Sequence, residues 1–162
     1  AHSNRGGWQS SWDFDRWGGD SGARLLGFVY ALATKLTMTR DGKPAQPQWR
    51  SNSWANVNRR GDTNEFHTHP GCFWSGAYYV DDGGSDPSFG GEFEIADPRG
   101  PAPAMYRPEL VPMLPGAESS GASVIIRPQA GQVFLFPSWL SHAVRPYRGE
   151  GTRISVAFNL SL

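Results

Sequence analysis

The sequence predicts a mainly β domain, a sandwich or jelly roll that carries one packing helix. Glycine (20 residues), proline (13) and aromatic residues (13%) are plentiful, whereas strong helix formers are scarce. This composition is typical of short strands joined by many turns. About eight short strand-like segments follow residue 47, with turn residues at regular spacing between them. Only one segment, near the N-terminus, has the periodicity of a helix.

This helix is expected at about residues 21–38. Asp20 and Ser21 are suited to capping its start, and Asp41-Gly42-Lys43-Pro44 follows its end. Its apolar residues recur at helical spacing and are expected to pack against a sheet: Leu25, Phe28, Val29, Leu32 and Leu36. Residues 1–19 are rich in glycine, serine and tryptophan and are expected to form an irregular arm.

The rest of the chain, residues 47–162, is expected to form the jelly roll. The expected strands are 49–57, 66–69, 75–80, 90–95, 123–127, 132–136, 141–145 and 153–160. Residues 98–122 are rich in proline and lack a regular pattern. A loop of this length is usually functional or mobile, so it is interpreted either as a lid or as a segment that contacts nothing. The prediction is therefore a single domain over residues 1–162.

Size and charge limit the classes of function. A chain of 162 residues is long enough to bury a core. Its 15 basic and 15 acidic side chains give zero net charge, which disfavours nucleic acid as a partner. No apolar run approaches the roughly 20 residues that span a membrane, and no secretory signal opens the chain, although Ala1-His2 is typical of a processed end. The single cysteine, Cys72, excludes an internal disulfide and fits a reducing, cytoplasmic location.

His67 and His69 are the first candidate site residues. Side chains two apart in a strand point to the same face, so both imidazoles are expected to project together. Such a pair can ligate a metal; the alternative is a pair of surface or hydrogen-bonded histidines. His142 follows a hydrophobic strand and a proline-containing turn, and is the candidate for a third ligand.

The last expected strand opens with a second candidate group. Arg153 and Ser155 share one face of it. A guanidinium with a nearby hydroxyl suits a carboxylate, because charge-assisted bidentate contacts are strong. An exposed ion pair at the strand end is the alternative.

Taken together, these residues resemble the iron(II)- and 2-oxoglutarate-dependent oxygenases, which share a cupin-like double-stranded β-helix. The resemblance runs from about Gly7 to the C-terminus and is narrowest to a bacterial and phage subgroup whose members carry an extra N-terminal segment, so this chain is expected to be shortened. The segments that carry it are Asn64-x-x-His-x-His-Pro, Ser75-Gly-Ala-Tyr-Tyr-Val, Leu135-Phe-Pro-Ser-Trp-Leu-x-His and Arg153-Ile-Ser-Val-Ala-Phe-Asn159.

The resemblance implies an iron(II) site at His67 and His142. His69 falls where the family has an aspartate or glutamate, so the implied site has three histidines. Imidazole is a good iron ligand, but without the carboxylate the centre keeps a higher positive charge, which alters its metal affinity and redox potential. In the alternative, His69 does not bind the metal and a nearby carboxylate completes the site: Asp62, Glu65 or Asp81.

The resemblance also implies that 2-oxoglutarate is the co-substrate. Arg153 and Ser155 would bind its far carboxylate, while its keto oxygen and near carboxylate chelate iron(II). The polar residues that are candidates for further hydrogen bonds are Asn56, Asn64, Tyr78 or Tyr79, and Asn159. Among the tryptophans, Trp139 is the best candidate to lie near the metal, and core packing is the default for the others.

The implied activity is hydroxylation of a small-molecule or peptide substrate, with release of succinate and CO2. The sequence does not select the substrate, and it leaves the oligomeric state open, with a homodimer as one alternative. Two other functions stay open. One is a cupin-type three-histidine metalloenzyme that does not use 2-oxoglutarate. The other is a non-catalytic β-sandwich module whose metal is structural, with Cys72 as a fourth ligand that closes the site.

Overall fold

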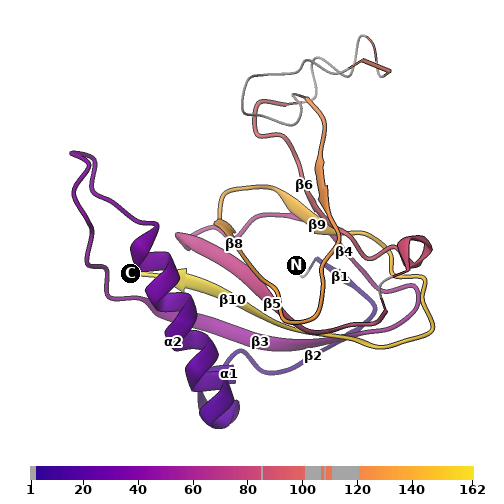
Figure 1. The fold of residues 1–162 in the computed structure, drawn as a ribbon, viewed down its shortest axis with the longest axis horizontal. Coiled ribbons are helices and arrows are strands. Elements are labelled where there is room, and N and C mark those ends of the chain that lie inside the picture. Colours follow the sequence, from indigo (N-terminus) through magenta and orange to yellow (C-terminus); the bar gives the residue numbers. More distant parts are fainter. Residues whose placement is uncertain (1–2, 85, 101–106, 108, 111–120) are drawn as a thin grey trace.

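The computed structural model describes residues 3–84, 86–100, 107, 109–110 and 121–162, which form two five-stranded sheets in which every pairing is antiparallel (Figure 1). The first sheet contains, in spatial order, β1 (Asn4–Arg5), β4 (Thr63–His67), β9 (His142–Val144), β6 (Phe93–Ile95) and β7 (Val124–Ile126). The second contains β2 (Trp8–Gln9), β3 (Arg50–Asn58), β10 (Arg153–Ser161), β5 (Trp74–Asp82) and β8 (Val133–Pro137). The predicted mainly β, jelly-roll fold is confirmed.

The principal helix, α2 (Gly19–Lys35), follows a short helix, α1 (Phe14–Trp17). The prediction of a helix is correct, but both of its ends were placed too late. Gly18 is the residue at the N-cap, so Asp20 lies in the first turn. The helix stops before Thr37 because the hydroxyl of Thr37 donates to the carbonyl of Ala33, one of the carbonyls left unpaired at a helix end.

The predicted irregular arm was wrong in part. Residues 3–19 contain β1, β2 and α1, and the two short strands extend the edges of the two sheets. β1 pairs with β4, whereas β2 pairs with β3. A composition rich in glycine and tryptophan hid these strands, because each is only two residues long and has no period to detect.

The core lies between α2 and the second sheet, whose outer face the helix covers (Figure 1). The buried cluster consists of Phe14, Leu26, Val29, Ala33, Val156, Phe158 and Leu160. The predicted apolar stripe is partly wrong, because Phe28 and Leu36 are 56% and 52% exposed. The packed face instead includes two small residues: Gly22 makes room for the ring of Phe14, and Ala33 belongs to the buried cluster shared with β10.

Alternation along β10 positions the candidate site. Val156, Phe158 and Leu160 are buried against the helix, whereas the intervening residues, Arg153, Ser155, Ala157 and Asn159, line a cavity between the two sheets. The neighbouring strand β3 contributes the same kind of inward face to this cavity, through Asn52, Trp54, Asn56 and Asn58. One strand therefore holds both the core and the site, on opposite faces.

Two expected strand bounds were wrong. β4 ends at His67 rather than at His69. β6 begins at Phe93 rather than at Gly90, because Gly90 and Gly91 have positive φ angles, which interrupt the extended backbone. The lid interpretation of residues 98–122 falls mostly outside the described residues. The extent of a single domain over residues 1–162 stays a prediction.

Within the described part of the chain, no helix is both long and apolar enough to cross a membrane.

Candidate metal centre and co-substrate pocket

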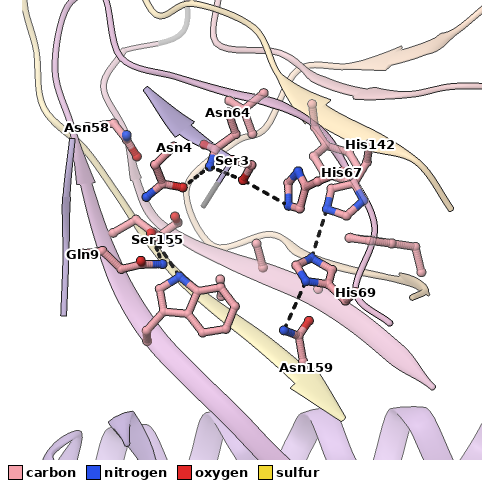
Figure 2. Close-up of a pocket in the computed structure, with 18 of the residues that line it drawn as sticks. Ser3, Asn4, Gln9, Asn58, Asn64, His67, His69, His142, Ser155 and Asn159 are labelled. Carbon is pink, nitrogen blue, oxygen red and sulfur yellow. Dashed lines mark hydrogen bonds between the residues drawn. The ribbon is translucent and has the colours of Figure 1, made fainter. Parts of the chain in front are cut away.

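Three imidazoles converge at one end of the cavity (Figure 2). His67 is the last residue of β4 and His142 the first of β9, and the two are direct cross-strand partners. His69 joins them from the turn after β4. Their potential ligand nitrogens all lie within 4.8 Å of one another. Sequence reasoning had selected these three histidines, and the structure brings them together.

The reason given for the His67–His69 pair was wrong. His69 lies outside β4, so alternation along a strand does not orient it. It belongs to a turn in which the amide of Cys72 donates to the carbonyl of His69 (3.2 Å). The amide of His69 donates in turn to the carbonyl of Ser138 (3.0 Å). A contact between two distant turns therefore sets the position of His69.

The outer nitrogens of His67 and His142 have matching partners. Nδ1 of His67 lies 2.7 Å from the carbonyl of Glu65, and Nδ1 of His142 lies 2.9 Å from the carbonyl of Leu140. A carbonyl only accepts, so each Nδ1 carries the proton and donates. The lone pair of each imidazole is then on Nε2, which is the arrangement typical of metal-ligating histidines.

The three imidazoles are held in the neutral form that a metal requires. Burial lowers the pKa of His142 to about 4 and, with the neighbouring His67, that of His69 to about 4. Burial also lowers the pKa of His67. Phe136 packs edge-on against the His142 ring, with centroids 4.6 Å apart, which contributes to this desolvation.

The donor set fits a metal ion. Nε2 of His69 and Nε2 of His142 are 3.3 Å apart, close to the roughly 3.0–3.4 Å expected for adjacent ligands that are each about 2.1 Å from one ion. Nδ1 of His67 and Nδ1 of His142 carry the proton, so their Nε2 lone pairs are available to a metal, and iron(II) accepts imidazole readily. The three histidines would thus hold one face of the ion.

The carboxylate alternatives point elsewhere. Glu65 pairs with Arg5 (2.8 Å) at the surface. Asp62 accepts from the amide of Arg59 (2.7 Å) and Asp81 from the amide of Gly83 (2.9 Å). No carboxylate and no cysteine among the described residues joins the histidine cluster, so Cys72 does not close the site there.

Arg153 is buried in the same cavity, with 6% of its surface exposed. Its guanidinium lies over the rings of Tyr79 and Tyr147, 5.5 Å and 5.6 Å from their centroids. No carboxylate in the described part of the chain forms an ion pair with it. A buried cation without a counter-anion is costly, so this arrangement suits an anionic ligand.

Glycines make room for Arg153. A Cβ at Gly91 would lie 2.5 Å from Nη1 of Arg153, and one at Gly83 would lie 2.7 Å from its Cγ. Tyr147 is fixed behind the guanidinium because its hydroxyl donates to the carbonyl of Gly83. The segment Gly90-Gly91-Glu92-Phe93 therefore contributes to the pocket twice, because Phe93 also packs against His142, with ring centroids 5.5 Å apart.

The cavity measures about 270 Å³, and carboxamides dominate its polar wall. The carboxamides are Asn4, Gln9, Asn52, Asn56, Asn58, Asn64 and Asn159. Trp12 and Trp54 add an aromatic pair with ring centroids 5.9 Å apart. Histidines apart, Arg153 is the one ionisable cation among the described lining residues, and no carboxylate lines the cavity.

Most of the other sequence-selected residues lie on this wall, with two exceptions. Ser155, Asn56, Asn64 and Asn159 line the cavity (Figure 2 labels all but Asn56). Tyr79 lines it rather than Tyr78. Burial raises the pKa of Tyr79, so its hydroxyl stays protonated. Trp139 is 65% exposed and does not line the cavity, so the expectation that it lies near the metal was wrong.

Sequence reasoning missed several residues. Tyr147 has no distinguishing pattern, and Trp12 and Gln9 lie in the supposed irregular arm. Asn58 could have been found, because it continues the alternation of Asn52, Trp54 and Asn56. Ser75 and Ser138 are in contact with one another but lie far apart in the sequence, so no local sequence signal identifies them.

A β-helix of two sheets with a histidine cluster and a buried arginine in one cavity is the architecture of a metal-dependent oxygenase of the 2-oxoglutarate type. The family model described as "Putative 2OG-Fe(II) oxygenase" matches residues 52–159. The chain therefore belongs to the 2OG-Fe(II) oxygenase family.

Solved structures share the fold at low sequence identity. A prolyl hydroxylase from Trichoplax adhaerens, in complex with a hypoxia inducible factor peptide fragment, has a TM-score of 0.67 and 15% identity over 99% of this chain and 65% of that chain. Viral collagen prolyl hydroxylase from Paramecium Bursaria Chlorella virus-1, solved as a 2OG complex, has a TM-score of 0.60 and 12% identity over 99% of this chain and 81% of that chain. An oxidoreductase of the 2OG-Fe(II) oxygenase family from Burkholderia pseudomallei has a TM-score of 0.57 and 15% identity over 86% of this chain and 55% of that chain.

Two further facts complete the comparison. The chain spans a little over half to about two thirds of the length of the first solved structures that it matches. None of the curated proteins compared with the chain matches it.

Proposed function

We propose that this chain is an iron(II)- and 2-oxoglutarate-dependent oxygenase that hydroxylates an uncharged substrate. One observation carries the proposal. A cluster of three neutral imidazoles and a buried arginine, which has no carboxylate partner among the described residues, open onto the same cavity. The first suits a metal and the second suits a dicarboxylate, and the family's co-substrate needs both.

The residues have separate roles. His67, His69 and His142 hold one face of the metal and leave its other positions open to ligands. Arg153 binds the far carboxylate of 2-oxoglutarate, and Ser155, on the same face of β10, adds a hydroxyl. Tyr79 and Tyr147 hold the guanidinium in place through their rings.

When bound, iron(II) and 2-oxoglutarate supply the oxidising chemistry: dioxygen converts 2-oxoglutarate to succinate and CO2 and a substrate C–H bond to C–OH. The chain contributes positions and a dry environment. Phe93 and Phe136 pack against His142 and exclude water from that side of the cluster. No acid–base pair is needed, and the low pKa of His69 and His142 keeps both imidazoles uncharged at neutral pH.

The wall opposite the histidines indicates what the substrate is like. Nε1 of Trp54 donates to Oδ1 of Asn56 (3.1 Å), so that oxygen already has a partner within the wall. The side chains of Asn52 and Asn58 have no hydrogen-bond partner among the described residues. Uncharged donors and acceptors beside an aromatic pair suit a small molecule or peptide that has amide or hydroxyl groups and no charge at this end.

The first experiment is anaerobic titration of 2-oxoglutarate into the iron(II)-loaded protein. Chelation by the keto acid gives a weak visible charge-transfer band. His142→Ala is expected to abolish the band, and Arg153→Ala to raise the 2-oxoglutarate concentration for half-saturation about tenfold or more. Arg24→Ala, on the exposed face of α2, is the matched control and should match the unmodified protein.

The same titration separates the alternative functions. A three-histidine metalloenzyme that does not use 2-oxoglutarate would bind iron and give no band, and Arg153→Ala would change nothing. A non-catalytic module would bind zinc with all positions filled and give no succinate under aerobic conditions. Either result would overturn the proposal.

The substrate part has its own test. Uncharged capped peptides and charged small molecules are added in parallel to aerobic reactions with iron(II), 2-oxoglutarate and ascorbate. Succinate formed above the substrate-free level is measured. Stimulation by uncharged compounds is expected, and stimulation by acidic or basic compounds alone would contradict it. A cytoplasmic location, a homodimer and the absence of a nucleic-acid partner stay predictions.

A further inference from the structure

His69 lacks the anchor that the other two histidines have. Nδ1 of His67 and Nδ1 of His142 each face a backbone carbonyl, which can only accept. Nδ1 of His69 instead faces the carboxamide of Asn159, at 3.3 Å (Figure 2). A carboxamide has a donor end and an acceptor end, so this partner alone does not fix which nitrogen of His69 carries the proton.

In the structure, the side chains of Asn159, His69 and His142 are placed so that each hydrogen bond between them has one donor and one acceptor. The amide nitrogen of Asn159 faces Nδ1 of His69, so that nitrogen accepts and the proton is on Nε2. Nε2 of His69 lies 3.3 Å from Nε2 of His142, whose lone pair is free because its Nδ1 donates to Leu140. His69 therefore donates to His142. This is a metal-free arrangement, since Nε2 of His69 cannot both carry a proton and bind a metal.

A metal needs the opposite tautomer of His69. Its proton must move to Nδ1, and the partner there must accept. A half-turn of the Asn159 carboxamide places Oδ1 against Nδ1 and the amide nitrogen against Ser75, whose hydroxyl now donates to Oδ1 at 2.7 Å. Ser75 must then accept from Asn159 and donate elsewhere.

Ser138 can receive that donation. Oγ of Ser75 and Oγ of Ser138 are 2.8 Å apart, and either hydroxyl can be the donor. Both serines are 1% exposed, so the exchange needs no bulk water. Ser138 also holds the main chain of His69, because its carbonyl accepts from the His69 amide. The three residues thus hold both the backbone and the ring of His69.

We propose that Ser138, Ser75 and Asn159 form a reversible hydrogen-bond chain that sets the tautomer of His69 and reverses direction when a metal binds. Asn159 is a positioning residue in this chain. It does not bind the co-substrate, which is the role that sequence reasoning had given it. The inference rests on the proposed metal site, and its test separates the two.

The decisive variants are Asn159→Asp and Asn159→Leu, which are similar in size to asparagine. A carboxylate only accepts, so Asp holds the proton on Nδ1 and presents Nε2 to the metal at all times. Leu provides no partner. We expect Asn159→Asp to bind Co²⁺ about tenfold more tightly than the unmodified chain, and Asn159→Leu to bind it about 10–100-fold more weakly. Affinity is measured by calorimetry and by the visible absorption of Co²⁺.

The two Asn159 variants are expected to change the Co²⁺ affinity in opposite directions. A merely structural role for Asn159 would not give this result, because disruption of a buried contact would weaken Co²⁺ binding in both variants. Asn52→Asp is the matched control. It adds the same charge to the cavity wall, across from Asn159 on β3, with no contact to His69. Its affinity for Co²⁺ should change by no more than about twofold. Weaker binding in both Asn159 variants, or equal tightening in Asn52→Asp, would overturn the proposal.

A second measurement does not depend on the metal. Nitrogen NMR of the histidine rings distinguishes the two neutral tautomers directly. In the metal-free chain His69 is expected to be protonated on Nε2, and in Asn159→Asp on Nδ1. Ser75→Ala, a small change that should fold, removes the acceptor for the reversed chain and should weaken Co²⁺ binding several-fold. Protonation of His69 on Nδ1 in the unmodified metal-free chain would refute the inference.

The two proposals fail differently. If the unmodified chain does not bind Co²⁺, the metal site of the proposed function is wrong. If it binds Co²⁺ but the order of affinities for Asp, Asn and Leu at position 159 does not hold, only the hydrogen-bond chain is wrong.

Discussion

At the scale of single residues, Arg153 is suited to binding an anionic ligand but is unfavourable for the stability of the ligand-free fold. Its guanidinium is buried over two tyrosine rings without a carboxylate partner in the described part of the chain. The tyrosines stabilise it, but they do not replace water or an anion in full. Before the co-substrate binds, this position is therefore expected to destabilise the protein.

Arg153→Met tests this expectation. Methionine fills a similar volume without a charge, so the free energy of unfolding of the ligand-free protein should rise by about 1 kcal/mol. The charge-transfer band with 2-oxoglutarate should be lost in the same variant. Urea denaturation measures the first effect and absorbance the second. A less stable variant would show that the tyrosines already compensate the charge.

The three histidines also make stability depend on pH. Burial lowers the pKa of His69 and His142 to about 4, whereas an unfolded histidine has a pKa near 6.5. Between these values the unfolded chain binds protons that the folded chain does not, so stability falls as pH falls from 6.5 towards 4. Each imidazole contributes at most about 1.4 kcal/mol per pH unit, and partial exposure reduces this.

The measurement is the free energy of unfolding of the metal-free protein from pH 7.5 to pH 4. His142→Ala removes one of the two strongly shifted groups, so its stability should fall less steeply over this range. Carboxylates contribute equally to both proteins and cancel in the difference. Parallel curves would mean that the pKa of His142 is not depressed.

At the scale of elements, the turn before β6 shapes the co-substrate pocket. Gly91 has a φ of +73°, and a Cβ there would lie 2.5 Å from Nη1 of Arg153. The turn thus needs glycine both for its backbone and for the space beside the guanidinium. Its position, two residues before the strand that packs on His142, links the arginine and the histidine cluster.

Gly91→Ala should therefore weaken 2-oxoglutarate binding about tenfold, because the guanidinium is displaced from its carboxylate position. Gly42→Ala is the matched control: Gly42 also has a positive φ, +81°, but nothing lies within 4 Å of an added Cβ. Both variants should lose about 1 kcal/mol of stability from the backbone alone. Equal 2-oxoglutarate affinity in the two would contradict the role of Gly91.

At the scale of the whole molecule, the metal is expected to join parts of the chain that are far apart in sequence. His67 ends β4, His69 lies in the turn after it, and His142 begins β9, more than seventy residues later. An ion bound to all three favours the folded state only, because the unfolded chain does not bring these residues together.

Co²⁺ at a hundred times its dissociation constant should therefore stabilise the protein by about 2.7 kcal/mol. For a chain of this size that corresponds to an increase in Tm of roughly 5–10 °C. EDTA should reverse the increase, and His142→Ala should not show it. The metal-dependent Tm, measured by calorimetry, needs no knowledge of the substrate.

Features set by local sequence could be predicted, whereas features set by packing could not. Alternation along β3 and β10 and the spacing of the strands are local properties, so the fold class and the inward face with Arg153, Ser155 and Asn159 could be predicted. The ends of α2, the strands β1 and β2 and the exposed positions of Phe28 and Leu36 could not. The end of α2 depends on the hydrogen bond of Thr37 to Ala33, and the exposed positions depend on which face of the helix packs against the second sheet.

The sequence by itself determined that the chain forms a β domain of the 2-oxoglutarate oxygenase type, because its periodicity and its histidine and arginine motifs are written in residue order. The tertiary structure decided how those residues meet. It placed His67 opposite His142 and brought His69 in from a turn rather than a strand. Tyr79, and not Tyr78, lines the cavity. Hydrogen bonds connect Ser138, Ser75 and Asn159 to His69. Contacts across 63 to 90 residues of chain create this geometry, and no local pattern encodes them.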